Sequence, residues 1–503
     1  MMHFVEMLTN WMWGVPLIVT MLAVGLFFTV FSRFFQFSQL RHILQQTFGG
    51  LFHKNEAQGK DGILSPFEAI SVAVGGTIGV GNIGGVATAI AVGGPGALFW
   101  LLVAGVAGQM IKMVEVTLAV HYRSKDENGN PYGGPPYYMK KGIGEEMGFK
   151  TAYKILSFLF LFGMFSSIFI TMQNYTVSEA IASTFNFNQW AANLIHGVFP
   201  QSDPNAMAQY NLSQAVISIF YAIITYIMIA GGLKKLGRIA SIIVPFMCIF
   251  YLGGGLVAIL KNLALIPATV QLVLRDAFTG TAAIGGFAGA TFAIAIQKGL
   301  ARAVFSNEAG WGTSPMIHST ARTDHPIRQG LWGIFEVTIS TMLVCTITAF
   351  TIIITSRWQT GLSGATLTLS AFETGMGSIG RIVLTVGIFL FGITTSSGWY
   401  TYYEILFRYI LKPGSKVKER ALTIYKWTYP IPGMGLVLYA VYYGLPSQKI
   451  WTFADFSTGL PTFANIIAIM VLSPKFFTLL RDYKARHMGI GKIDPKTRIF
   501  YES

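Results

Sequence analysis

Charged residues are scarce in this chain. They make up 12% of its 503 residues, whereas a soluble globular domain carries roughly 25%. Hydrophobic residues account for 52%, and the mean hydropathy is +0.53. This composition argues against a soluble enzyme or binding module. A bilayer core about 30 Å thick requires roughly 20 apolar residues per crossing helix, and several uninterrupted apolar runs reach that length.

Cysteine and clustered histidine are also lacking. Cys248 and Cys345 both lie inside apolar runs, where small buried hydrophobic side chains are expected rather than a disulfide. The eight histidines are scattered, with no H-E-x-x-H motif, no Cys/His cluster and no convincing Ser/His/Asp grouping. We therefore expect neither catalysis nor a structural metal site. Met1 to Asn10 hold no Lys or Arg, so we expect the first apolar run to be retained rather than cleaved as a signal peptide.

Apolar runs separated by polar or Gly/Pro-rich breaks predict an all-α integral membrane protein of about eleven transmembrane helices. Allowing for errors of several residues at each boundary, the predicted spans are 14–34, 66–91, 96–120, 154–182, 211–230, 239–260, 280–298, 329–355, 380–407, 427–444 and 451–480. One continuous membrane domain of this kind uses nearly the whole chain.

The net charge of +14 comes from Lys and Arg that gather in alternate loops between these spans. The intervening loops hold only Lys261, Arg275, Arg357 and Lys449. Because basic residues accumulate on the cytoplasmic side, this segregation predicts a multi-pass protein of the cell membrane with its N-terminus outside and its C-terminus in the cytoplasm. The same segregation argues against nucleic acid as a partner, since no nucleic-acid-binding module accompanies the basic residues.

Two predicted spans carry glycine-rich interruptions. Residues 74–85 read Val-Gly-Gly-Thr-Ile-Gly-Val-Gly-Asn-Ile-Gly-Gly, and residues 279–291 repeat the theme with Gly280, Gly285, Gly286 and Gly289. Such segments are poor helix formers. They lie five spans apart and run in opposite directions in the predicted topology. This layout is typical of an inverted repeat of five plus five helices, preceded by one extra helix, in which helices 2 and 7 are discontinuous.

The repeat organisation divides the chain into four parts. Residues 1–64 form an N-terminal transmembrane helix with a basic cytoplasmic loop, 65–262 and 263–480 form the two repeats, and 481–503 form a basic cytoplasmic tail. Half-helix N-termini attract a carboxylate and unwound carbonyls coordinate a cation, so the pattern favours an amino acid carried with Na⁺. An alternative is that glycines such as Gly81 and Gly85 only allow close helix packing. The G-x-G-x-x-G match at 79–84 has no strand before it and does not indicate a dinucleotide site.

Four stretches resemble the alanine/glycine:cation symporter family, the sodium:alanine symporters. They are residues 81–89 leading into the G-G-P-G-A-L-F-W of 93–100; Y-G-G-P-P-Y-Y at 132–138; F-S-N-E-A-G-W-G at 305–312; and Gly398-Trp399 with Glu404. The resemblance covers nearly the whole chain and implies the leucine-transporter type of fold. It also implies Na⁺-driven uptake of a small neutral amino acid, alanine or glycine first. Departures such as Val80 and Leu101-Leu102 leave a larger neutral amino acid, for example glutamine, as an alternative.

The resemblance also implies a site at the interrupted helices. The residues expected to face the substrate are Thr77, Gly79, Asn82, Gln173, Gly285, Phe287, Gly289 and Thr291. Sodium is expected at the carbonyls of Gly75 and Ile78 and the hydroxyls of Thr394 and Thr395, since a hard cation suits hard oxygen ligands. Two other interpretations stay open. The hydroxyls at 394–397 could bond back to their own helix, and Gln173 could join neighbouring helices.

Ionisable residues inside predicted spans are functional candidates. Glu68, Lys112, Glu115 and Glu404 lie near cytoplasmic ends, where structural roles are expected. Glu336 lies about two turns into its span, deep enough for a proton or cation site, and we hypothesise that it tunes ion coupling. Proton coupling is therefore an alternative to Na⁺. A channel is less consistent with the sequence, which shows no filter-like segment and has broken antiparallel helices instead.

Overall fold

The computed structural model describes residues 11–49, 62–166, 172–198, 201, 203–207, 209–285, 287–444 and 447–501. In these ranges the protein is mostly helical, with one two-stranded antiparallel sheet. Five of the described helices are long and apolar enough to cross a membrane, and the number rises to seven if two bent pairs each count as one span. The prediction of a helical membrane protein is confirmed, while the count of about eleven spans stays a prediction.

Elements of the first half surround one interrupted helix. In chain order they are α2 (Val15–Phe31), α3 (Phe35–Ser38), α4 (Leu40–Leu44), the π-helix η1 (Gln45–Gly49), α5 (Pro66–Thr77), the π-helix η2 (Gly81–Gly85), α6 (Val86–Gly93), α7 (Ala97–His121), β1 (Ser124–Lys125), β2 (Pro131–Tyr132), α8 (Pro135–Tyr138), the π-helix η3 (Met139–Glu146), α9 (Lys150–Ser166), α10 (Met172–Thr184), α11 (Asn188–Val198), α12 (Pro204–Met207), α13 (Leu212–Ile229) and α14 (Gly232–Leu260). In the small sheet Ser124 pairs with Tyr132.

The second half begins with elements that the sequence did not predict. In chain order it contains the 3₁₀-helix η4 (Leu263–Leu265), α15 (Ile266–Thr279), α16 (Phe292–Asn307), α17 (Ser314–His318), α18 (Pro326–Val337), the π-helix η5 (Thr338–Cys345), α19 (Thr346–Ile354), the 3₁₀-helix η6 (Arg357–Thr360), α20 (Gly364–Met376), α21 (Ser378–Ile410), α22 (Lys416–Thr428), α23 (Pro430–Tyr443), α24 (Ser447–Val471) and α25 (Ser473–Met488). Helices α15 and α20 were not among the predicted spans.

Local sequence signals explain where α5 begins. Ser65 accepts a hydrogen bond from the Glu68 amide at 3.2 Å, and the Glu68 carboxylate accepts one from the Ser65 amide at 2.8 Å. Pro66 occupies the first helical position, where its missing amide proton is not needed. This reciprocal capping satisfies two amides that the helix itself leaves unpaired. It fixes the start of the helix that carries the interrupted segment.

Helices α5 and α6 pack beside α17 and α16, and the two segments of chain run in opposite directions. Leu64, just before α5, forms a bridge with Ala321, shortly after α17 ends. Helix α17 contacts α5, and α16 contacts α6. The chain therefore enters α5 at the level where it leaves α17, and it reaches α6 at the level of α16. Helix α7 packs along both α16 and α18 and covers these two helices from one side.

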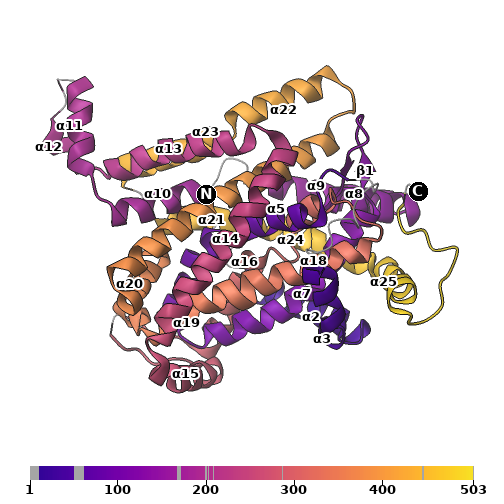
Figure 1. Ribbon diagram of the computed structural model, residues 1–503, viewed down its shortest axis with the longest axis horizontal. Coiled ribbons are helices and arrows are strands. Elements are labelled where there is room, and N and C mark those ends of the chain that lie inside the picture. The colour runs from indigo at the N-terminus through magenta and orange to yellow at the C-terminus, as the bar shows by residue number, and fades with distance from the viewer. Residues whose placement is uncertain are drawn as a thin grey trace.

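Figure 1 shows the helix bundle extended along one axis, with different elements at its two ends. Helices α15 and α20 lie at one end, while α8, β1 and α25 lie at the other. Large apolar side chains stand exposed on the sides of the bundle, among them Phe158, Phe220, Ile242 and Ile249. An apolar surface this broad on a helical bundle is expected where lipid, not water, covers the protein.

The predicted span at 280–298 is wrong in the structure. None of the described residues among 280–291 is helical, and α16 begins only at Phe292. The segment is an irregular hairpin in which Thr281 pairs with Ala290 and Ile284 pairs with Phe287. Gly280 and Gly289 adopt conformations that end helices, with φ of +81° and +87°. The glycine-rich run therefore connects α15 to α16 and does not interrupt a membrane helix.

Candidate functional site

The first interruption lies where the sequence places it. Helix α5 ends at Thr77, Ile78 is extended with φ −84° and ψ 97°, and the helix resumes as η2 at Gly81. The two parts are bent by 50°. Glycine and β-branched residues are poor helix formers, so unwinding the chain here costs less free energy than it would in a run of good helix formers. The break leaves backbone amides and carbonyls available within the buried interior of the bundle.

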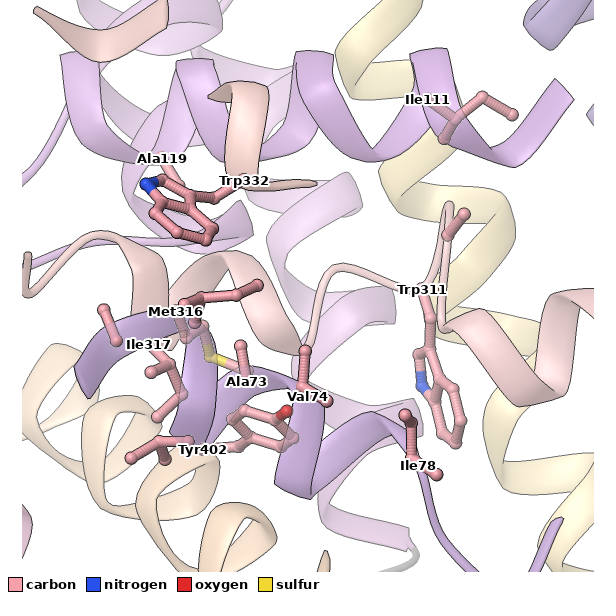
Figure 2. Close-up of a cluster of buried hydrophobic side chains, with 14 of the residues drawn as sticks. Ala73, Val74, Ile78, Ile111, Ala119, Trp311, Met316, Ile317, Trp332 and Tyr402 are labelled. Carbon is pink, nitrogen blue, oxygen red and sulfur yellow. The ribbon is translucent and has the colours of Figure 1, made fainter. Parts of the chain in front are cut away.

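The glycines of this segment also bring α5 against α21. A Cβ atom on Gly76 would lie 2.4 Å from the Tyr402 hydroxyl, and one on Gly79 would lie 2.7 Å from Thr395 Oγ1. Gly398 on α21 approaches Gly76 in the same way. Close packing and interruption of the helix are therefore both present. Figure 2 shows the buried cluster around this point, in which Ile78, Trp311 and Tyr402 take part.

Three of the four residues expected at the sodium site meet in the structure. Thr395 Oγ1 donates to the carbonyl of Gly75 at 2.9 Å and to that of Ile78 at 3.1 Å. The Thr394 hydroxyl instead donates to the carbonyls of Leu390 and Phe391 in its own helix. Thr394 is nevertheless close, because its Cβ lies 3.1 Å from the position of a Cβ on Gly75. These are the neutral hard oxygens that a monovalent cation accepts.

Asn82 holds the break in shape. Its Oδ1 accepts a hydrogen bond from the Gly79 amide at 3.1 Å. Its Nδ2 donates to the carbonyls of Ser306 on α16 and Ser340 on η5, each at 3.3 Å. The side chain is 1% exposed. Because both polar atoms are engaged within the protein, Asn82 positions the unwound backbone in this state of the molecule.

A second interruption lies at residues 308–313, between α16 and α17, and not at 279–291 as the sequence analysis expected. Glu308 ends α16 in the left-handed region with φ +51°, and Gly310 and Gly312 follow with φ +83° and +84°. A left-handed residue at this position terminates a helix. The chain is therefore broken between α16 and α17, and this break carries the E-A-G-W-G part of the F-S-N-E-A-G-W-G motif. Trp311 from this break lies in the buried cluster of Figure 2.

The other expected substrate residues lie away from both breaks. Gly285 abuts η6, since a Cβ there would lie 2.6 Å from the Gln359 carbonyl. The Phe287 ring packs 5.2 Å from the Trp358 ring, Gly289 belongs to the irregular hairpin, and Thr291 caps α16 by accepting from the Ile294 amide. The hairpin covers Gly94 at the far end of α6. The structure does not bring these four residues together with Thr77, Gly79 and Asn82.

Gln173 lies on α10, a helix that packs on α13 and α21. Its side chain is half-buried. The adjacent Asn174 performs the helix-joining role that was considered for Gln173, because its Nδ2 donates to the Ser218 carbonyl of α13 at 3.2 Å. Helix α10 thus lies against the helix that carries Thr395, and the role of Gln173 as a substrate ligand stays a prediction.

A fully buried carboxylate joins the two broken helices. Glu336 on α18 accepts hydrogen bonds from Thr77 at 2.6 Å, from Ser314 at 3.1 Å and pairs with His318 at 3.0 Å. Lys112 Nζ lies 3.7 Å from the same carboxylate, and both side chains are 0% exposed. Thr77 ends α5, whereas Ser314 and His318 belong to α17. One side chain thus holds the ends of both helices.

Several residues of this network were not identified from the sequence as site residues. Lys112, expected to have a structural role near the cytoplasmic end, is buried within α7 and also donates to the Glu308 carbonyl at 2.9 Å and to Ser314 at 2.8 Å. The Glu308 carboxylate accepts from Thr313 and, at 3.5 Å, from Tyr402. A glutamate followed shortly by two helix-breaking glycines, Gly310 and Gly312, was a visible signal. Glu308 was not identified as a site residue because hydropathy assigns charged residues to loops.

A further network supports the second break from outside. Asn465 on α24 donates to the Gly310 carbonyl at 2.9 Å and to the Glu115 carboxylate, and it accepts from the Tyr138 hydroxyl. Tyr138 closes the Y-G-G-P-P-Y-Y stretch. Gly134 in the same stretch has φ +134° and lies against Met316 of α17. This motif therefore acts by bracing α17 and the break before it.

Comparison with known proteins identifies the family to which this chain belongs. The model of the sodium:alanine symporter family matches residues 1–496. The sodium/alanine symporter AgcS of Methanococcus maripaludis is 33% identical over 498 residues, which cover 96% of this chain and 98% of that protein. The probable sodium/glutamine symporter GlnT of Bacillus subtilis is 33% identical over 504 residues, covering 99% and 93%. Among solved structures, MhsT in complex with L-phenylalanine has a TM-score of 0.48 at 15% identity, covering 82% of this chain and 90% of that one.

Proposed function

This chain belongs to the sodium:alanine symporter family, and from that premise we propose that it carries a small neutral amino acid into the cell together with Na⁺. It is a membrane transporter and not an enzyme. Alanine and glycine are the first candidates, and L-glutamine is the alternative because a relative is named for glutamine. Transport proceeds by alternating access of a site at the broken helices.

The observation that carries the proposal is the convergence of Thr395 on two carbonyls of the break. A hydroxyl has one proton, yet Thr395 Oγ1 lies within hydrogen-bond distance of both the Gly75 and the Ile78 oxygens. Three oxygens therefore share a single proton at one buried point. Na⁺ bound there satisfies all three at once, with Thr394 as the fourth expected ligand. When the ion is released, the Thr395 hydroxyl again donates its hydrogen bond to the carbonyls.

The substrate is placed at the break itself. Helical amides at the start of η2 have no intrahelical partner and favour a carboxylate. Gly79 and Asn82 shape the backbone that presents these amides, and Gln173 on α10 is the proposed side-chain partner. Phe305 on α16 closes the opposite side, since a Cβ on Gly81 would lie 2.6 Å from its ring. A site bounded by these groups fits a small zwitterion.

The topology completes the proposal. The distribution of basic loops supports an N-terminus outside and a C-terminus in the cytoplasm, and we infer that the end of the bundle with α15 and α20 faces outward. The second repeat begins with α16, and its first member is the broken pair α16–α17, antiparallel to α5–α6. An inverted repeat of this kind belongs to the leucine-transporter type of fold.

A proton-coupled mechanism is the second candidate, and the Glu336 network favours it. A buried carboxylate contacts both broken helices, so a change in its protonation state alters its hydrogen bonds to each of them. Proton coupling then replaces Na⁺ coupling, or accompanies it. The two mechanisms differ in their response to Na⁺ and to pH.

Uptake into proteoliposomes tests both candidates. Radiolabelled L-alanine, glycine and L-glutamine are each supplied with an inward Na⁺ gradient, with an inward proton gradient and with neither. Accumulation that requires Na⁺ supports symport and ranks the substrates. Accumulation that follows the proton gradient and ignores Na⁺ overturns the cation site at Thr395, and equilibration without accumulation contradicts a symporter of either kind.

A further inference from the structure

A separate cavity of about 270 Å³ opens beside the first break, at the end of the bundle that carries α20. Its walls come from three elements: Gly84 of η2, Thr176 and Glu179 of α10, and residues 361–366, which lead into α20. This volume is slightly below the roughly 300 Å³ at which pockets for drug-sized molecules begin. The cavity therefore suits a molecule of few heavy atoms.

One wall presents polar groups that lack partners. Thr176 is 4% exposed, and its hydroxyl has no hydrogen-bond partner in the described structure. Buried polar atoms without partners are rare, because each costs about 1–3 kcal/mol. Glu179 follows three residues later, so the two side chains share a face of α10. Glu179 is half-buried, and it has no electrostatic interaction with a charged side chain among the described residues.

The opposite wall presents the N-terminal turn of α20, a helix of 13 residues. Ser363 is extended with φ −144° and ψ 172°, and its side chain does not cap the helix. The first amides of α20 have no intrahelical partners and carry the positive end of the helix dipole. They approach η2 closely, since a Cβ on Gly84 would lie 3.1 Å from the Ala365 amide nitrogen.

We propose that this cavity is a second, outer binding site for amino-acid zwitterions. The ammonium group binds Glu179 and the free Thr176 hydroxyl, and the carboxylate binds the first amides of α20. The inference rests on the proposed transport of amino acids and adds a site through which the substrate passes before it reaches the break at Gly79. Because each wall recognises one charge, removal of either charge from the ligand weakens binding.

The test uses purified full-length protein in detergent with a single reactive cysteine. Cys248 and Cys345 are buried, so Ser363→Cys, on the exposed rim of the cavity, supplies a thiol for a charged maleimide. L-alanine, glycine and L-glutamine are each added as protecting probes. We expect at least one of them to slow labelling several-fold, while ethylamine and propionate, which lack one charge, give little protection. Thr366→Cys provides a second reporter on the same wall.

Matched variants locate the protection. Glu179→Gln in the Ser363→Cys protein should abolish it, whereas Glu373→Gln, on an α20 carboxylate paired with Arg381, should leave it intact. Protection should also persist in Thr395→Ala, where the proposed sodium site is removed. Loss of protection in Thr395→Ala, or its survival in Glu179→Gln, overturns the outer site.

Failure of the proposed outer site can be distinguished from failure of the proposed transport function. If none of the three amino acids protects either cysteine while the unmodified protein accumulates one of them, the outer site is wrong and the transport function stands. If protection follows the expected pattern but no amino acid is accumulated with Na⁺ or protons, the cavity binds zwitterions and the proposed transport is wrong.

Discussion

Removal of the Thr395 hydroxyl is the sharpest perturbation of the proposed sodium site. Thr395→Val keeps the size and β-branching of the side chain and removes one oxygen from a point where three converge. Thr395 is 2% exposed, so water has little access to replace that oxygen. The carbonyls of Gly75 and Ile78 remain in place without their hydrogen-bond donor.

The magnitude follows from the lost ligand. Hydrogen bonds to charged groups contribute roughly 1.5–3 kcal/mol, and we take the same order for one hydroxyl ligand of Na⁺. At 1.4 kcal/mol per factor of ten, the Na⁺ concentration for half-maximal uptake should rise about 10- to 100-fold. The effect on folding is smaller, because a neutral intramolecular hydrogen bond contributes only about 0.5–1.5 kcal/mol. The variant should therefore fold and bind Na⁺ poorly.

The assay is uptake of the transported amino acid into proteoliposomes as external Na⁺ is varied. Thr395→Ser restores the oxygen and should return the half-maximal Na⁺ concentration most of the way to that of the unmodified protein. Ser397→Ala is the matched control, since Ser397 is buried on the same helix but donates only to the Ile393 carbonyl. An unchanged Na⁺ dependence in a folded Thr395→Val protein would refute the assignment.

Three further predictions follow from the same contacts. Gly79→Ala should abolish Na⁺-driven uptake because its Cβ would lie 2.7 Å from Thr395 Oγ1, while Gly253→Ala, which meets nothing within 4 Å, should transport normally. Glu336→Gln leaves the Lys112 charge buried without its partner, so thermal unfolding should show a loss of about 3–5 kcal/mol, which Lys112→Met should partly restore; uptake with unaltered Na⁺ and pH dependence would count against a coupling role. Asn82→Ala removes the acceptor of the Gly79 amide and should cost about 1–3 kcal/mol in the same measurement, and equal stability would contradict its positioning role.

The long spans could be predicted because nothing interrupts their apolar pattern. The sequence predicts spans at 96–120 and 380–407, and the structure has α7 at Ala97–His121 and α21 at Ser378–Ile410. The first broken helix could be predicted for a similar reason. Its glycines lie within a run that is apolar on both sides, so the only helix-breaking signal falls in the middle.

The second break could not be located by the same rule. Glycine-rich runs are equally poor helix formers in a hairpin outside a helix and in an interruption within one. Residues 279–291 have the more obvious glycine pattern, yet they connect α15 to α16. Residues 308–313 contain Glu308 and were assigned to a loop, because the cost of a charge in the membrane depends on partners distant in sequence. Those partners are Tyr402 and the Lys112 that binds the Glu308 carbonyl.

The site could be predicted in part, to the extent that its members lie in one segment. Gly75, Ile78 and Gly79 share the first break, and the resemblance to the family adds Thr395. The Glu336 network is different, because its hydrogen bond to Thr77 spans 259 residues of sequence. No periodicity or spacing relates two such residues. Only the packing of α5 against α18 brings them within reach.

That network constrains how the protein can move. Glu336 contacts the end of α5 through Thr77 and the start of α17 through Ser314, so a displacement of either broken helix changes the ligands of the same carboxylate. Lys112, which is bound to the Glu308 carbonyl at the second break, shares that carboxylate. Because a buried charge cannot be left without partners, the two helices must either move together or exchange partners at Glu336. The Gly75 oxygen lies on the last turn of α5 and the Ile78 oxygen lies just after it, so this exchange changes the geometry of the proposed sodium site.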